Sequence, residues 1–136
     1  MNSSRLTPLN GSSGRYKCVV CWLDGDPGIA KPLTEATSLL LSPVALGEYR
    51  FGILASRERA AYDVKLQQLE KRFGVLALDA ATAVAYAEIR RQLKADGRPI
   101  PWHDVWIAAQ AKQHKAHILS NDGHFDYVKG IERIGW

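Results

Sequence analysis

Residues 101–125, PWHDVWIAAQAKQHKAHILSNDGHF, decide the fold class that the sequence predicts. The first part predicts a helix in which Asp104 shares a face with Ile107, because residues three apart are neighbours on a helix. A short apolar strand over residues 116–120 follows the helix, and Asp122 comes after that strand. A helix that leads into a short apolar strand is typical of α/β domains, whose parallel strands are covered by helices.

The same alternation of strands and helices extends toward the N-terminus. Residues 38–42, SLLLS, predict another strand, and Pro43 begins a helix that contains Glu48. On that helix Glu48 shares a face with Ala45 and Phe51, so its carboxylate is expected among apolar side chains. The other predicted elements are helices over residues 56–73 and 79–94 and strands over residues 74–78 and 131–134. Together they predict an α/β domain with a parallel sheet covered on both faces.

Length and composition predict one globular domain. The chain has 136 residues, of which 46% are hydrophobic and 24% are charged. Residues 1–14 are rich in Ser, Asn and Gly and are predicted to be disordered or loosely packed, so the domain is expected over residues 15–136. The net charge of +4 suits nucleic acid or an acidic protein as a partner, and it is equally ordinary for a slightly basic enzyme.

Cysteine content and hydropathy bear on where the protein works. Two cysteines are too few for a disulfide scaffold, which favours a reducing cytoplasm. No stretch has the length of a membrane span, and the first fifteen residues lack the apolar core of a secretory signal. We therefore expect a cytoplasmic protein that does not enter a membrane.

Three acids, Glu48, Asp104 and Asp122, are predicted to meet at one edge of the sheet. Asp122 follows a strand, and the other two lie in early helical turns, which face the carboxyl ends of the strands. Three carboxylates at one place repel each other, and a bound divalent cation removes that repulsion. Because hard oxygen ligands suit Mg²⁺ or Mn²⁺, the sequence predicts a site for one of these ions.

Three stretches together resemble PIN-domain proteins of the VapC toxin type. They are residues 42–53 (SPVALGEYRFGI), residues 78–111 (LDAATAVAYAEIRRQLKADGRPIPWHDVWIAAQA) and residues 118–136 (ILSNDGHFDYVKGIERIGW). The resemblance runs from about residue 22 to the C-terminus, and the order and spacing of three motifs make it specific. It implies a three-layer α/β/α PIN-like domain with a central parallel sheet. On this resemblance Glu48, Asp104 and Asp122 match the second, third and fourth acidic positions of the family.

The resemblance also implies an activity and its partners. Such proteins are metal-dependent endoribonucleases, usually the toxins of type II toxin–antitoxin pairs, and an antitoxin covers the acidic site. It implies an RNA substrate, a cognate antitoxin and a homodimer. Asp104 and Asp122 would be metal ligands, directly or through water, and Glu48 would hold metal-bound water or a second ion. Ser120 and Asn121 would orient this catalytic cluster.

The N-terminal part of the family pattern is not matched. In the family an acid closes strand one and is followed by Thr-Asn or Thr-Ser, and no such element occurs here. If residues 22–27 match the end of the first helix of the family, the missing Asp falls near Arg15. Residues 9–14 upstream have no strand character, so strand one is expected to be lost. The alternative function is therefore a catalytically impaired PIN domain that binds antitoxin or RNA without cleaving.

Several further polar residues have two interpretations. His103 either touches substrate or is an exposed loop residue, Asp79 is interpreted as a helix N-cap, and Asp126 as a surface residue. Cys18 and Cys21 form a C-x-x-C pair, for which a redox module is the alternative function. Four cations near the end of the 79–94 helix either contact RNA phosphates or form a solvated helix end. These cations are Arg90, Arg91, Lys94 and Arg98.

Overall fold

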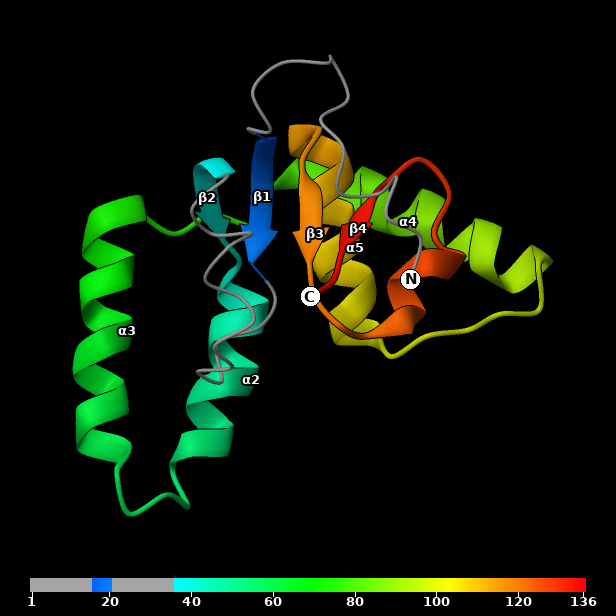
Figure 1. Ribbon diagram of the computed structural model, residues 1–136. Coiled ribbons are helices and arrows are strands. Elements are labelled where there is room, and N and C mark those ends of the chain that lie inside the picture. Colours follow the sequence, from blue (N-terminus) through cyan, green and yellow to red (C-terminus); the bar gives the residue numbers. More distant parts are fainter. Residues whose placement is uncertain (1–15, 21–35) are drawn as a thin grey trace.

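Four parallel strands form the sheet at the centre of the molecule (Figure 1). The computed structural model describes residues 16–20 and 36–136, with side chains from residue 38 onward. Within these residues the strand order is β2-β1-β3-β4. The strands are β1 (Tyr16–Val20), β2 (Ala36–Leu41), β3 (His117–Leu119) and β4 (Arg133–Ile134). The predicted strands 38–42, 116–120 and 131–134 correspond to β2, β3 and β4.

The strand β1 corrects the expectation that strand one is lost. It lies between β2 and β3, where Val19 pairs with Leu40 on one side and Ile118 on the other. The five residues YKCVV, most of them apolar, are enough to form this strand, because a central strand of a parallel sheet is enclosed by its neighbours. The residue that follows β1 in the sequence is Cys21, which is not an acid. The predictions for residues 1–14 and 22–27 lie outside the described residues, and so does Cys21 of the C-x-x-C pair.

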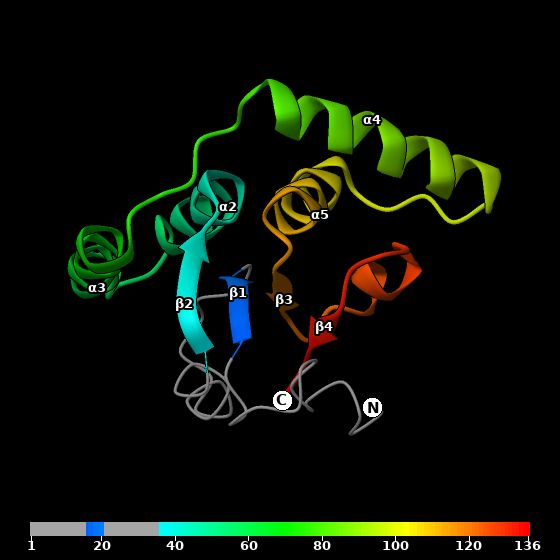
Figure 2. The same ribbon diagram turned by 90° about the horizontal axis from the view of Figure 1, so that it is seen from above.

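The described helices lie along one face of the sheet and at its edges (Figure 2). They are α2 (Pro43–Ile53), α3 (Arg59–Phe73), α4 (Ala80–Ala95), α5 (Trp102–His114) and the short 3-10 helix η3 (Gly123–Tyr127). Figure 2 shows α2 and α5 along one face of the sheet, α4 across the outer side of α5, and α3 beside the β2 edge. None of the described helices is long and apolar enough to cross a membrane.

The sequence signals for helix ends act as expected. The Ser42 hydroxyl accepts a hydrogen bond from the backbone N–H of Val44 at 3.2 Å, which caps α2 just before Pro43. Asp79 and Thr82 exchange hydrogen bonds of 3.0 Å in a capping box at the start of α4. These caps satisfy backbone donors that have no partner inside the helix.

Residues 74–78 do not form the predicted strand. Val75 makes a single bridge to Leu41, and the Leu76 N–H donates to the Leu41 carbonyl at 2.9 Å. Beyond this point the segment leaves the sheet edge, and Val75 and Leu78 are 46% and 44% exposed. Residues 74–78 therefore meet β2 at a single point and form a connection rather than a strand.

The helix α5 is the centre of the core. Val105, Ala108 and Ala109 are at most 1% exposed, because α5 lies between the sheet and α4. Small alanine side chains let the helix approach both neighbours closely. The ring of Trp106 on α5 stacks on Tyr86 of α4, with centroids 4.0 Å apart. The first turn of α5, which carries Asp104, is therefore held by the best packed part of the fold.

One polar side chain in this core has no hydrogen-bond partner in the part of the chain that the structure describes. Gln110 on α5 is fully buried, and no described residue forms a hydrogen bond with its amide nitrogen or oxygen. A buried amide without a partner costs about 1–3 kcal/mol in proteins.

We expect Gln110→Leu to raise the free energy of unfolding by about 1–3 kcal/mol, since leucine has a similar size and no polar group. Urea unfolding followed by circular dichroism measures this. Gln113→Leu is the matched control and is expected to destabilise, because Gln113 bonds Thr82 at 2.6 Å and Asp79 at 2.9 Å. A loss of stability in Gln110→Leu would show that the Gln110 amide forms hydrogen bonds in the folded protein.

Candidate active site

The sheet topology brings the predicted acids to one hollow. Because all strands are parallel, the ends of β2 and β3 and the first turns of α2 and α5 lie at the same edge. A hollow of about 290 Å³ at this edge is lined by Glu48, Asp104 and Asp122, together with His103. The structure therefore brings together the three predicted site acids and adds an imidazole that the sequence left with two interpretations.

Asp104 is the buried member of this group. Its side chain is 8% exposed, and it lies in the first turn of α5, where the helix dipole favours a negative charge. Burial raises the pKa of the Asp104 carboxyl above its ordinary value. The nearby His103 and a hydrogen bond with His124 act in the opposite direction, while the charge of Asp122 adds to the rise. A carboxylate in this position favours a bound cation.

Asp122 is held by the turn that follows β3. Its backbone N–H donates to the Ser120 hydroxyl at 2.9 Å, and its carboxylate accepts from the backbone N–H of His124 at 2.9 Å. The second bond caps η3, so the carboxylate is oriented by local chain geometry. Ser120 therefore positions the acid, as predicted, and its own side chain is buried.

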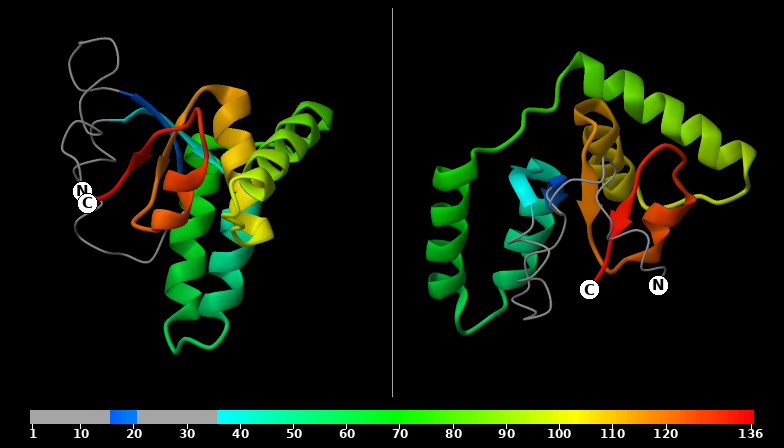
Figure 3. Two further views of the ribbon diagram at one scale, coloured as in Figure 1. Left: turned by 90° about the vertical axis from the view of Figure 1, so that its right-hand side faces the viewer. Right: turned by 45° about the horizontal axis from the view of Figure 1, so that its top comes forward.

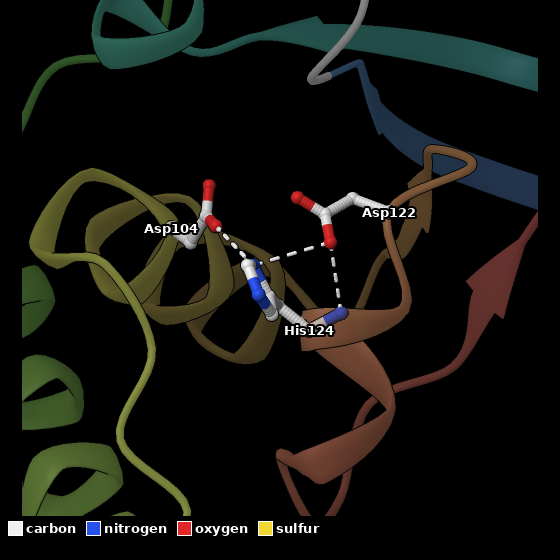
Figure 4. Close-up of side chains that lie close together, drawn as sticks. All are labelled: Asp104, Asp122 and His124. Atoms are coloured by element: carbon white, nitrogen blue, oxygen red, sulfur yellow. Dashed lines mark hydrogen bonds and ion pairs between the residues drawn. The ribbon is translucent and has the colours of Figure 1, made fainter.

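His124 lies between the two aspartates, as Figure 4 shows. Its Nδ1 atom is 3.2 Å from Asp122 Oδ1 and 3.3 Å from Asp104 Oδ2. His124 is not among the site residues predicted from the sequence. A signal was present, since Asp122-Gly123-His124 is a side-chain-capped turn that folds the imidazole back toward the acid.

Glu48 does not lie among apolar side chains, which corrects that expectation. Its side chain is 57% exposed, and Phe51 on the same helix is 76% exposed, so this face of α2 is not packed into the core. Glu48 instead faces His103, with Oε1 3.7 Å from Nδ1. The other ring nitrogen of His103 is 3.4 Å from Asp104 Oδ1, so this imidazole links Glu48 to the buried acid.

The donor atoms fit a divalent cation. One ligand atom from each of Asp104, Asp122 and His124 lies within 4.8 Å of the others, and the three side chains point toward one another (Figure 4). Two carboxylates suit Mg²⁺, and an imidazole beside them makes Mn²⁺ an equally good fit. Glu48 lines the same hollow but is not part of this group.

The other polar residues lie where their structural roles require. Asp79 caps α4, and hydrogen bonds from the backbone and side chain of Thr82 lower the pKa of its carboxyl. Asp126 forms two hydrogen bonds with Arg133, at 3.0 and 2.9 Å. Asn121 lines the hollow, while its side-chain oxygen accepts from the Trp136 N–H at 2.9 Å and so anchors the C-terminus.

Comparisons with known proteins agree with this geometry. The model of the PIN domain family matches residues 18–131. Ribonuclease VapC4 of Mycobacterium tuberculosis is 36% identical over 96 residues, which are 69% of this chain and 74% of that protein. The tRNA(fMet)-specific endonuclease VapC of Shigella flexneri is 29% identical over 99 residues, 72% of this chain and 75% of that one.

Solved structures of such proteins share the fold. The VapBC-1 structure of nontypeable Haemophilus influenzae superposes with a TM-score of 0.74 at 21% identity, covering 88% of this chain and 97% of that one. The VapBC2 structure of Rickettsia felis bound to a DNA fragment gives 0.73 at 19% identity, covering 88% and 98%. The matched family model, the related sequences and the acidic edge of a parallel sheet show that this chain belongs to the PIN-domain family, as a member of the VapC ribonuclease type.

Proposed function

We propose that the protein is a metal-dependent endoribonuclease and the toxin of a type II toxin–antitoxin pair in the cytoplasm. The observation that carries this proposal is the convergence of Asp104, Asp122 and His124 at the carboxyl edge of the sheet. The naming of its relatives as ribonucleases supports RNA as the substrate. In this chemistry a phosphodiester is hydrolysed by water, which needs an activated nucleophile and a neutralised phosphate charge.

The residues of the hollow have distinct parts in this proposal. Asp104 and Asp122 would hold Mg²⁺ or Mn²⁺, with Glu48 for metal-associated water or a second ion. When bound, such an ion lowers the pKa of water and offsets the negative charge of the transition state. His103 positions Glu48 relative to Asp104, because its two ring nitrogens face one carboxylate each. Ser120 holds the backbone of Asp122 in register with the site.

A second candidate function is a PIN domain that binds RNA or antitoxin without cleaving. It is favoured by one observation, the absence of an acid immediately after β1, where Cys21 stands in the sequence. Fewer carboxylates bind an ion less tightly, so this candidate differs from the first in metal affinity and cleavage. The antitoxin and the homodimer are parts of the proposal under either candidate.

The proposed antitoxin needs a surface, and α2 and α3 offer one. A groove of about 600 Å³ between them is lined by Phe51, Ile53 and Leu54, of which the first and last are 76% and 61% exposed. Arg50 forms ion pairs with both Asp63 and Glu70, which ties α2 to α3 beside the groove. The similar solved structures are named VapBC, which supports a protein partner, and the exposed apolar side chains of this groove are a surface that such a partner can cover.

We expect the protein to cleave RNA in the presence of Mg²⁺ or Mn²⁺ and Asp104→Asn to lower the rate about 100-fold or more. Loss of a metal ligand removes several kcal/mol of transition-state stabilisation, and each 1.4 kcal/mol is tenfold. The measurement is cleavage of a tRNA, rRNA and mRNA panel, with EDTA as a parallel arm. Glu88→Gln, an exposed acid on α4, is the control and should retain activity. Cleavage that survives both EDTA and Asp104→Asn would refute the proposed mechanism.

Without metal, Asp104→Asn is expected to raise the melting temperature at pH 7. Because burial raises the pKa of Asp104 in the folded state, the protonated acid stabilises the fold at low pH. That stability is present below the unfolded pKa and is lost as pH rises through the folded pKa, so the ionised carboxylate destabilises the protein at neutral pH. Added Mn²⁺ should then raise the melting temperature of the natural chain and leave the melting temperature of Asp104→Asn unchanged. Equal responses to Mn²⁺ would place the ion elsewhere.

We expect Phe51→Asp to weaken binding of the cognate antitoxin about 10-fold or more, because a charge in an apolar groove loses its hydration on binding. Titration calorimetry with the purified pair measures the affinity. Val84→Asp on α4 is a matched control, since Val84 is also exposed, at 62%, and lies outside the groove. Equal losses in both variants would show that the groove is not the binding surface.

A further inference from the structure

A second hollow lies outside the acid cluster, between the C-terminal half of α4 and the first turn of α5. Its volume is about 590 Å³. The floor is apolar, because Leu93, Ile100 and Val105 are at most 8% exposed. The walls carry the cations Arg90, Arg91 and Lys94 and the indole of Trp102. This combination of an apolar floor, a large aromatic ring and three cations needs an explanation beyond a solvated helix end.

Among the described residues, no acidic side chain neutralises the positive charge of this hollow. No acidic residue lines it, and within the described residues none of Arg90, Arg91 and Lys94 forms an ion pair. Cations at the end of α4 are favoured by the helix dipole, but that interaction is weak and does not require an aromatic neighbour. The three charges are therefore available to an anionic ligand.

Aromatic rings hold one of these cations in place. The guanidinium carbon of Arg90 lies 5.4 Å from the centre of the Trp102 ring and 5.8 Å from that of Tyr86. Tyr86 in turn stacks on Trp106 of α5. These contacts fix the position of the guanidinium group without neutralising its charge. A charged group held in place in this way is typical of a preorganised binding site.

Trp102 itself is the exposed part of the hollow. It is 68% exposed, which is costly for the largest apolar side chain unless a ligand covers it. A flat ring in water beside free cations is the way in which proteins bind unpaired nucleotides, with a base stacked on the ring and phosphates near the charges. A base within a duplex does not offer its face in this way.

The position of the hollow links it to the acid cluster. Trp102, His103 and Asp104 are consecutive residues of the first turn of α5. Trp102 lines the basic hollow, while His103 and Asp104 line the acidic one. The two hollows therefore share the first turn of α5, so a ligand at one lies close to the other.

We propose that the Arg90–Trp102 hollow binds an unpaired nucleotide of the RNA substrate beside the phosphodiester at the acid cluster. The base stacks on Trp102, and the adjoining phosphates lie at Arg90, Arg91 and Lys94. The choice of RNA as the source of this nucleotide rests on the proposed function, whereas the stacking and the phosphate contacts rest on the hollow alone.

The test measures binding separately from cleavage. A fluorescein-labelled oligouridine is titrated with the full chain carrying Asp104→Asn in EDTA, so that the RNA stays intact, and anisotropy gives the affinity. Adding Trp102→Ala is expected to weaken binding roughly 5- to 150-fold, the usual effect of removing one stacked base. Trp102→Phe should restore most of the affinity, because phenylalanine keeps a stacking face. Melting temperatures confirm that both variants fold.

The cations are tested by the salt dependence of the same binding. Replacing Arg90, Arg91 and Lys94 with Gln should make the slope of log K against log salt less negative by about 2, since each phosphate contact to a single strand contributes about 0.7. The matched control replaces Arg57, Lys65 and Lys71 with Gln, which removes the same charge near α3. Figure 3 shows α3 and α4 at opposite ends of the molecule, so the control should leave the slope nearly unchanged.

The outcomes separate this inference from the proposed function. Unchanged affinity in both Trp102→Ala and the Arg90–Arg91–Lys94 variant overturns the nucleotide site, even if the natural chain cleaves RNA. Equally tight, Trp102-independent binding of duplex RNA overturns it as well, and a preference for single-stranded DNA overturns the assignment to RNA. Trp102-dependent binding by a chain that cleaves no RNA supports the site and refutes the nuclease.

Discussion

The parallel direction of the strands is the constraint on which the site depends. It places the carboxyl ends of β2 and β3 at one edge, and the helices that follow or precede those strands begin there. Asp104 and Asp122 are eighteen positions apart in the sequence, yet one imidazole, that of His124, contacts both carboxylates. An antiparallel arrangement would send one of these acids to the opposite edge of the sheet.

The helix α5 combines core packing with chemistry. Its alanines lie against the sheet and α4, and its first turn presents Asp104 to the hollow. Packing fixes the position of the carboxylate, and the same burial makes its charge unfavourable in the absence of a cation. The ionised form of the site is therefore more stable when a cation is bound beside Asp104.

The first turn of α5 lines two hollows whose side chains carry opposite charge. Acids from α2, α5 and the segment after β3 surround one hollow, and cations from α4 surround the other. A polyanion can approach the acids only where positive charge compensates the repulsion, either from bound metal or from nearby side chains. The stacking of Tyr86 on Trp106 and the contacts of Arg90 with the Tyr86 and Trp102 rings join α4 to α5 at this boundary, so packing between these helices sets the relative position of the two hollows.

The sequence alone determined the alternation of strands and helices, the start of α2 at Pro43, the cap at Asp79, and the acids that meet at the edge of the sheet. These features follow from local periodicity, from cap chemistry and from the geometry of parallel sheets, and they need no distant contact. Tertiary structure decided what depends on partners far along the chain. Residues 16–20 became a central strand because β2 and β3 flank them, while residues 74–78 did not become one because they meet β2 at a single point. The exposure of Glu48, the place of His124 between two aspartates, and the basic hollow at Trp102 were also decided there, since each depends on how α2, η3, α4 and α5 pack together.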